Sequence, residues 1–479
     1  MNITDFSFFI FLIITWIAYY ATPLRSRWIP LLLGSVVFYY FAGFEALLVM
    51  SVTVVTTYIF SRLLEKQKKK IFLVLPLVIN FGIMIFAKYT GFILSNIPGI
   101  DNANDITSKI IVPLGISFYT FQSVAYLVEI YKNKFQPEKN FAKFALYITF
   151  FPHIIQGPIA RFEQLSPQLF NGNKFDYDKN VKGVLLILWG ILKKTVIAER
   201  LGMVVGGIFD TGEYSSTFFV IAGAVLYALQ LYTDFSGYVN IASGAALCFG
   251  IELTPNFDTP YFARNISDFW RRWHISLSNW LRDFIYIPLG GNRKGKIRKN
   301  LNLLATMFVS GIWHGANWTF IVWGIYHGVI SILNTFTYPI GEKIRNKFGI
   351  RKEGFLCSAY QMITTSMLVC LGWIFFRAND IRTALNMIKG LFNFDFTNLI
   401  DKTRILCREN GLEKSQGIML AVFLLIFFVV EFLNYKKIYI SDKIVKMPFA
   451  VRLFIYVVSL ITLICFSVSG QGSFMYANF

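Results

Sequence analysis

The stretch SGIWHGANW (residues 310–318) lies in a run of 42 residues, 300–341, that contains no Asp, Glu, Lys or Arg. A run this apolar is typical of the hydrocarbon core of a bilayer, which about 20 helical residues span. Imidazole is costly to bury unless it is hydrogen-bonded or used, and an ionisable residue in a membrane segment indicates a functional site. His314 is therefore a candidate catalytic residue, although a buried histidine bonded to a neighbouring helix explains the pattern equally well.

The composition is that of a membrane protein that crosses the bilayer many times. Of the 479 residues, 55% are hydrophobic and 15% charged, and the mean hydropathy is +0.53. The core of a soluble domain stops growing well before it needs so much apolar surface. The net charge is +19, but the basic residues gather in short loops between apolar runs, which indicates membrane topology and not nucleic-acid binding. Five scattered cysteines without a CxxC pair predict neither a disulfide framework nor a metal site.

Apolar runs long enough to span the bilayer recur along the chain and predict an all-α fold of about 11–14 transmembrane helices in a single domain, residues 1–479. Residues 183–207 form an apolar run that charged residues interrupt. The clear runs are 6–24, 28–44, 46–61, 71–87, 110–128, 144–155, 214–233, 235–251, 300–341, 354–376, 416–430 and 453–470.

The loops between these runs differ in charge. Basic residues follow the first, third and fifth runs and precede the last one, whereas the loops near Phe44 and at 101–105 have few. This asymmetry predicts that the loops around Lys68 and Lys437 are cytoplasmic and that both termini lie outside. The N-terminal segment lacks the basic start of a signal peptide, so we expect a retained first helix.

Residues 254–298 are amphipathic and aromatic, too charged to cross lipid and too apolar for an ordinary loop. Such a segment lies in the membrane interface or dips into a cavity that protein lines. Three of the four histidines and six of the ten tryptophans lie between Trp270 and His327. An interfacial belt explains the tryptophans, but histidines beside arginines and serines favour a site. Residues 254–341 are therefore the predicted catalytic region.

Helical spacing relates several of these residues. Residues four apart share a helix face, which would pair Asp268 with Arg272 and place His274 beside Ser278. Asn317, three residues after His314, would share its face. His327 lies thirteen residues beyond His314 and would point away from it, as a structural residue. Ser310, four residues before His314, would resemble a Ser–His pair, but no acidic third member is near, so we interpret it as packing. His153 stays unassigned.

Several long motifs resemble the membrane-bound O-acyltransferase (MBOAT) family, and in particular the bacterial branch typified by the alginate O-acetylation protein. They are DFWRRWHISLSNWLRDFIYIPLGGNRKG (268–295) and GIWHGANWTFIVWGIYHG (311–328), supported by residues 113–134, 150–169, 192–201, 232–244 and 371–380. The likeness covers nearly the whole chain. It departs from the branch at Asn240, where the pattern usually has Asp, which puts the role of that carboxylate in doubt here.

The resemblance implies an acyltransferase whose helices surround a central tunnel, with His314 as the catalytic histidine and His274 as the second recurrent one. It implies no bound cofactor: the donor, acetyl-CoA or an acyl carrier, is a cytoplasmic thioester that acts as co-substrate. The acceptor would be a polysaccharide at the outer face, reached through a periplasmic or extracellular SGNH-type partner. The protein would lie in the inner membrane of a bacterial cell.

The chemistry of the residues is compatible with that activity. Imidazole titrates near neutrality, so His314 would act as the base that deprotonates an attacking hydroxyl. His274 would orient the acceptor, donate to the oxyanion or relay the proton. Hydrogen-bond donors in a dry site stabilise an oxyanion. The residues expected to bind substrate are Trp313, Asn317, Ser278, Trp273, Arg272 and Asn240.

Two alternatives stay open. D-alanyl transfer to teichoic acid would need an acyl-carrier protein that docks on the cytoplasmic face, and the helices after Asp380 make the chain long for that branch. A transporter or channel would use a histidine at mid-membrane to conduct protons, but its repeated, broken helices have no counterpart in this sequence.

Overall fold

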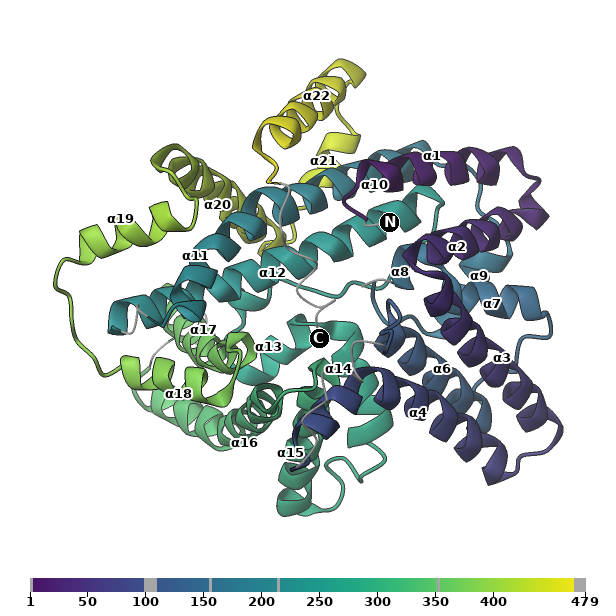
Figure 1. The fold of residues 1–479 in the computed structure, drawn as a ribbon, viewed down its shortest axis with the longest axis horizontal. Helices are drawn as coiled ribbons and strands as arrows, with labels where there is room; N and C mark the ends of the chain where they lie inside the picture. The colour runs from purple at the N-terminus through teal and green to yellow at the C-terminus, as the bar shows by residue number, and fades with distance from the viewer. Residues whose placement is uncertain are drawn as a thin grey trace. The chain divides into compact units, whose positions relative to one another are not determined.

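The computed structural model describes residues 3–98, 110–154, 157–212, 216–349, 351 and 354–468. The predicted loop 101–105 and the C-terminal stretch after 468 lie outside this part. All regular elements in it are helices, which confirms the predicted all-α class (Figure 1). The chain divides into two compact units, Met1–Gly190 with Tyr238–Pro255, and Ile191–Gly237 with Asn256–Phe479.

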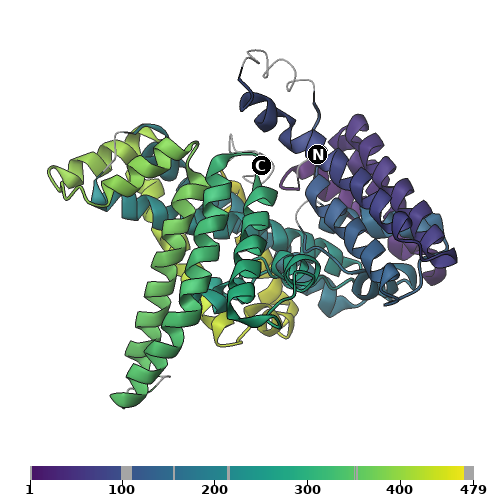
Figure 2. The same ribbon diagram turned by 90° about the horizontal axis from the view of Figure 1, so that it is seen from below.

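Seven helices in the described part are long and apolar enough to cross a membrane. They are α3 (Phe44–Lys66), α4 (Lys70–Ser95), α12 (Thr217–Cys248), α16 (Trp318–Lys347), α17 (Phe355–Arg377), α20 (Lys414–Tyr435) and α22 (Phe449–Phe466). Figure 2 shows α16 and α17 as two long helices that lie side by side. Most of the other predicted apolar runs form helices too, but shorter ones.

The shorter elements of the first unit carry several of its buried polar groups. His153, which the sequence left unassigned, is buried and its Nε2 lies 2.9 Å from Oε1 of Gln122. The Glu129 carboxylate accepts from Arg161 at 3.1 Å. The elements are α1 (Phe6–Ala21), η1 (Leu24–Ser26), α2 (Trp28–Ala42), α6 (Ile116–Tyr131), α7 (Phe141–Thr149), α8 (Phe151–Ile154), α9 (Phe162–Phe170) and α10 (Tyr177–Ile191).

The remaining elements belong to the second unit. A π-helix, η2 (Leu192–Ala198), precedes α11 (Glu199–Asp210), and the aromatic segment forms four short pieces. These are η3 (Pro260–Phe262), α13 (Ile266–Arg272), α14 (Ile275–Leu281) and the π-helix η4 (Arg282–Tyr286). Next comes α15 (Gly295–His314), and after α17 come α18 (Ile381–Gly390), α19 (Leu399–Glu409) and α21 (Ile440–Val445).

Two predicted boundaries are wrong. Runs 214–233 and 235–251 form the single helix α12, with Asp234 inside it. The helix continues because the Asp234 carboxylate is buried against Lys194 Nζ, 2.6 Å away, so the charge that marked a break is neutralised within the protein.

The long run 300–341, conversely, is an antiparallel hairpin of α15 and α16. The turn between them is short, and the Asn317 side chain caps α16 by accepting from the Thr319 N–H at 3.0 Å. Small residues let the backbones approach closely: a Cβ on Gly311 would lie 2.4 Å from the Phe320 carbonyl oxygen, and one on Gly324 would lie 2.5 Å from that of Met307. Such close contact through glycine is typical of helices packed in membranes.

Candidate active site

A cavity of about 180 Å³ lies between the aromatic segment and α15. Every residue that lines it falls within the predicted region 254–341, and among them only Arg282 carries a permanent charge. The lining residues are Trp270, Trp273, His274, Leu277, Ser278, Leu281, Arg282, Tyr286, Leu303, Thr306, Met307, Ser310 and His314.

One face of α15 forms a wall of the cavity. Its lining residues recur at three- and four-residue steps from Leu303 to His314, as expected for one stripe of a helix. Ser310 and His314 both belong to this stripe, so the spacing argument that placed them on one face is confirmed. Ser310 therefore lines the cavity.

His314 is the last residue of α15 and is 4% exposed. Its ring centroid lies 5.0 Å from Trp313, 4.9 Å from Trp323 and 5.1 Å from Phe376. It follows Lys299, the last charged residue of α15, by fifteen residues, or about 22 Å of helix.

His274 enters the cavity from the opposite side, at the N-cap of α14. Its backbone has φ 45° and ψ 55°, the left-handed region that a side chain rarely adopts. Two backbone hydrogen bonds flank it: the Asp258 N–H donates to the Arg272 carbonyl at 3.0 Å, and the Ile275 N–H donates to the Asn256 carbonyl at 3.0 Å. These neighbours hold the strained residue in place.

The Trp313 indole lies between the two histidines. Its ring centroid is 5.9 Å from that of His274 and 5.0 Å from that of His314. A second aromatic ring, Phe235 of α12, lies 4.8 Å from His274. The structure thus places His314 and His274 in the lining of one apolar cavity, with the Trp313 ring packed against both.

Two further predicted residues line the same cavity. Trp273 is 1% exposed and stacks on Phe269, with centroids 5.6 Å apart. The Ser278 N–H donates to the His274 carbonyl, and its hydroxyl donates to the Trp273 carbonyl at 3.3 Å. Ser278 and His274 thus meet at the start of α14, as their spacing predicts.

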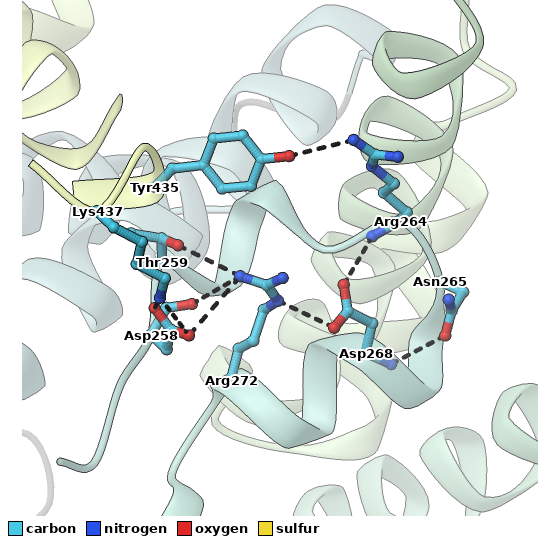
Figure 3. A network of polar contacts seen from close by, with 8 residues as sticks. All are labelled: Asp258, Thr259, Arg264, Asn265, Asp268, Arg272, Tyr435 and Lys437. Atoms are coloured by element: carbon cyan, nitrogen blue, oxygen red, sulfur yellow. Dashed lines mark hydrogen bonds and ion pairs between the residues drawn. The ribbon is translucent and has the colours of Figure 1, made fainter. Parts of the chain in front are cut away.

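Arg272 is not among the residues that line the cavity. Its side chain pairs with Asp268 at 3.0 Å, which confirms the pairing that their spacing predicts, and donates to the Asp258 carbonyl at 3.3 Å. Figure 3 shows this network, in which Tyr435 and Lys437 also reach the segment. The Lys437 ammonium lies 2.9 Å from an Asp258 oxygen, and Arg264 donates to the Tyr435 hydroxyl at 3.3 Å. Arg272, close in sequence to His274, therefore links Asp268 to the backbone of Asp258.

Asn317 does not share a helix face with His314, so that prediction is wrong. The helix ends at His314, and Asn317 caps the next helix while its amide donates to the Asn379 carbonyl at 2.9 Å. Asn240 is half-buried on the part of α12 that belongs to the first unit, and it is not a lining residue.

His327 is fully buried on α16 and is absent from the cavity lining. Its ring packs against Trp270 and Trp323, with centroids 5.0 Å away in each case. A Cβ added to Gly372 would lie 2.5 Å from its Nε2. The packing around this imidazole agrees with a structural role.

Sequence reasoning missed Asn256, whose side chain contacts His274 Nδ1 at 3.3 Å. It also missed Trp323, Phe376 and Phe235, which surround the two histidines. Asn256 follows a proline in the aromatic segment and lies eighteen residues before His274. The segment between them is not one continuous helix, so helical spacing could not predict that the two side chains meet. Only the tertiary fold brings these residues together.

Chemically, the site offers two imidazoles, two serine hydroxyls and two indoles in an apolar surround. In the part of the chain that the structure describes, no group of three His, Cys, Asp or Glu side chains could hold a metal ion. The arrangement suits the transfer of protons between a base and a hydroxyl in an apolar surround, where electrostatic interactions are strong.

Comparison with known proteins gives a consistent picture. The model of the MBOAT, membrane-bound O-acyltransferase family matches residues 19–354. The probable alginate O-acetylase of Pseudomonas aeruginosa is 33% identical over 455 residues, which cover 92% of this chain and 82% of that protein. The peptidoglycan O-acetyltransferase of Helicobacter pylori is 34% identical over 400 residues, 78% of this chain and 72% of that protein. The teichoic acid D-alanyltransferase of Bacillus subtilis is 29% identical over 276 residues, 55% of this chain and 68% of that protein.

Proposed function

Because the chain belongs to the membrane-bound O-acyltransferase family, we propose that it moves an acetyl group from a cytoplasmic thioester to hydroxyls of an extracellular or cell-wall polysaccharide. The observation that carries this proposal is the cavity that His314 and His274 both line, with the Trp313 ring in contact with each imidazole. The relatives named as O-acetylases share 33–34% identity over 78–92% of this chain, which supports acetyl as the group transferred.

The cavity has room for a short acyl group. Its volume of about 180 Å³ is close to that of the engineered cavity of about 150 Å³ that holds one benzene molecule. An acetyl or alanyl group is no larger than benzene, whereas a fatty acyl chain is several times longer. The cavity thus suits acetyl and also the D-alanyl group of the teichoic acid branch.

In the proposed reaction, the neutral His314 imidazole takes the proton of the acceptor hydroxyl as its oxygen attacks the thioester carbonyl. A C–O bond forms, the carbonyl electrons move onto oxygen, and the C–S bond breaks as they return. The thiolate leaves and takes the proton from the imidazolium, so the ester, the free thiol and neutral His314 remain. Residues 254–341 are the proposed catalytic region, with Trp273, Trp313 and Ser278 as the residues that line the path of the substrate.

The topology serves the same function. Thioester donors such as acetyl-CoA or an acyl carrier are cytoplasmic, and a surface glycan is outside. A histidine about 22 Å along a helix from a basic loop would let donor and acceptor meet within the protein. We place the chain in the bacterial inner membrane with both termini outside, and we propose that an SGNH-type partner acts with it on the outer side.

The test uses everted membrane vesicles, whose cytoplasmic face is outward, loaded with de-O-acetylated polysaccharide from the producing cells. Labelled acetyl-CoA is added outside, and label is counted in the polysaccharide recovered from the lumen. We expect label only in vesicles that carry this chain, and none when acetyl-CoA is enclosed with the polysaccharide instead. Equal labelling with and without the chain would overturn the proposal. Transfer of label from D-alanyl carrier protein alone would favour the D-alanyl branch.

A further inference from the structure

Three hydrogen-bond donors converge on a single atom beside the cavity, Oδ1 of Asn256. The Ser276 N–H donates to it at 3.1 Å, and the Ser276 hydroxyl donates at 2.9 Å. His274 Nδ1 lies 3.3 Å from it. Asn256 is 1% exposed, so its side chain is shielded from bulk solvent.

These contacts decide which nitrogen of His274 carries the proton. A backbone N–H can only donate, so the Asn256 atom that faces Ser276 is the carbonyl oxygen and not the amide nitrogen. His274 Nδ1 therefore faces an acceptor and must itself carry hydrogen. In the neutral ring the other nitrogen, Nε2, then bears a lone pair.

The Nε2 atom is buried and has no protein hydrogen-bond partner within the described residues. His274 lines the cavity, so its partner is expected there. A nitrogen with a lone pair accepts hydrogen bonds and cannot donate to an oxyanion. Of the three roles open to His274, orienting the acceptor and relaying the proton both remain compatible with this tautomer, and stabilising the oxyanion does not.

We propose that Asn256 is a positioning residue that holds His274 as the Nδ1–H tautomer, so that Nε2 accepts a hydrogen bond from the acceptor sugar. This inference rests on the proposed function. The attacking hydroxyl has one proton, which goes to His314. The bond to His274 therefore comes from a second hydroxyl of the acceptor. A sugar with neighbouring hydroxyls supplies this donor, and the contact turns the sugar towards the thioester.

The backbone supports the same assignment. The Asn256 carbonyl accepts from the Ile275 N–H at 3.0 Å, while its side chain accepts from Ser276 and His274. One residue thus holds the main chain after His274 and the ring of His274 itself. The left-handed backbone of His274 persists because its surroundings fix it.

Two substitutions test the proposal, and the kinetics are measured in the vesicle assay with labelled acetyl-CoA and de-O-acetylated polysaccharide. Asn256→Ala removes the acceptor that selects the tautomer. We expect kcat/KM for the polysaccharide to fall at least tenfold, while KM for acetyl-CoA stays unchanged. Ser276→Ala removes one of the two Ser276 donors to Asn256 but leaves the N–H that orients it, so it should lower kcat/KM less than Asn256→Ala does.

Asn256→Asp keeps the oxygen but places a carboxylate against Nδ1–H. A nearby negative charge favours the imidazolium and raises the pKa of His274 by roughly 1 unit or more. Charged His274 cannot accept, so activity should fall on the acid side at a pH roughly 1 unit higher than in the wild type. The other titratable or charged groups that line the cavity with His274 are His314, Tyr286 and Arg282, and Phe235 and Trp313, which contact its ring, are neutral.

The two variants also separate this inference from the proposed function. If Asn256→Ala fails to accumulate in the membrane, the pH profile of Asn256→Asp decides alone. A wild-type profile for Asn256→Asp, or wild-type kinetics for Asn256→Ala, overturns the role of Asn256. If His314→Ala is inactive in the same assay, the proposed site still stands. Full activity of His314→Ala would instead remove the proposed site.

Discussion

At the scale of the residue, the central feature is a pair of histidines that differ in how they are held. His314 ends a helix among aromatic rings, whereas His274 is bound to Asn256 through one ring nitrogen. A ring held at one nitrogen suits a positioning task. A ring that meets the attacking hydroxyl directly suits a base. The proposed function therefore gives the two imidazoles separate roles.

The difference predicts an order of effects. His274→Ala should reduce the rate of acetyl transfer less than His314→Ala does but more than His327→Ala does. Loss of a base typically lowers a rate by roughly 10²–10⁴-fold, and loss of one orienting contact lowers it less. Initial rates in the vesicle assay, per amount of variant in the membrane, check the order. A lower rate for His327→Ala than for His274→Ala would reverse the assigned roles.

Most residues of this candidate site could be predicted from the sequence, because a concentration of histidine and tryptophan in so apolar a region favours a functional site. His314, His274, Trp313, Trp273 and Ser278 were all anticipated, and the structure places them around one cavity or between its histidines. Asn317 was misplaced because the helix was assumed to continue past His314. A helix end depends on capping and on packing against the next helix, and a run without charges shows neither.

At the scale of the element, the α15–α16 hairpin positions His314. Its two helices approach through glycines, and the turn between them is closed by the Asn317 cap. Hydropathy showed that residues 300–341 belong in the membrane but gave no sign of where they turn, since no charge or proline marks the place.

Gly324→Ala should destabilise this hairpin. The added methyl group would lie 2.5 Å from the Met307 carbonyl oxygen and 3.1 Å from Gly311 Cα, both backbone atoms. Overpacking of this kind costs roughly 1–3 kcal/mol. The thermal midpoint in detergent should fall, as measured by the loss of monodisperse protein on heating.

Gly417→Ala in α20 is the matched control, because a Cβ there meets nothing within 4 Å. Alanine also has the higher helix propensity. An equal fall in the thermal midpoint for both variants would show that the close helix contact at Gly324 does not stabilise the hairpin.

The π-helix η2 turns Lys193 and Lys194 into the interior, where the sequence showed only an interrupted span. Lys194 Nζ lies 2.7 Å from Glu199 and 2.6 Å from Asp234, and Lys193 Nζ donates to Ser236 at 2.7 Å. Polar side chains therefore join η2 to α12 in the second unit. Charge alone could not reveal this, since the same residues would be equally plausible in a loop.

Lys194→Met should lower the stability of the protein strongly. Removing one partner of a buried ion pair leaves the other charge buried, at a cost of roughly 3–5 kcal/mol. Thermal unfolding in detergent measures the effect. Lys179→Met, which breaks an exposed pair with Glu252, should change the midpoint little. Similar midpoints for both variants would show that the buried ion pairs of Lys194 do not stabilise the protein.

For the whole molecule, the proposed function requires one defined orientation in the membrane. The class, the membrane character and the family were all anticipated from the sequence and are confirmed. Sidedness stays a prediction that rests on charge, because the loop 101–105 and the C-terminal stretch lie outside the described residues. This sidedness also determines from which face of the membrane the thioester donor would enter the cavity.

Cysteine labelling tests the orientation in a background without the native cysteines. With a membrane-impermeant maleimide, single cysteines at Lys68 and Lys437 should react only from the cytoplasmic side. Cysteines at Asn102 and Asn478 should react from outside. Intact cells expose the outer face of the protein to the reagent, and everted vesicles expose its cytoplasmic face. Labelling of Lys437→Cys in intact cells would contradict the proposed topology.

The most direct test of the central claim is the acetyl content of the surface polysaccharide in cells that produce His314→Ala in place of the natural chain. The variant should reach the membrane in normal amount, because it removes a polar ring from apolar surroundings. We expect O-acetylation to fall to the level of cells that lack the chain, while His327→Ala, corrected for its amount in the membrane, retains it. Wild-type acetyl content with His314→Ala would show that the cavity beside Trp313 is not where the acyl group is transferred.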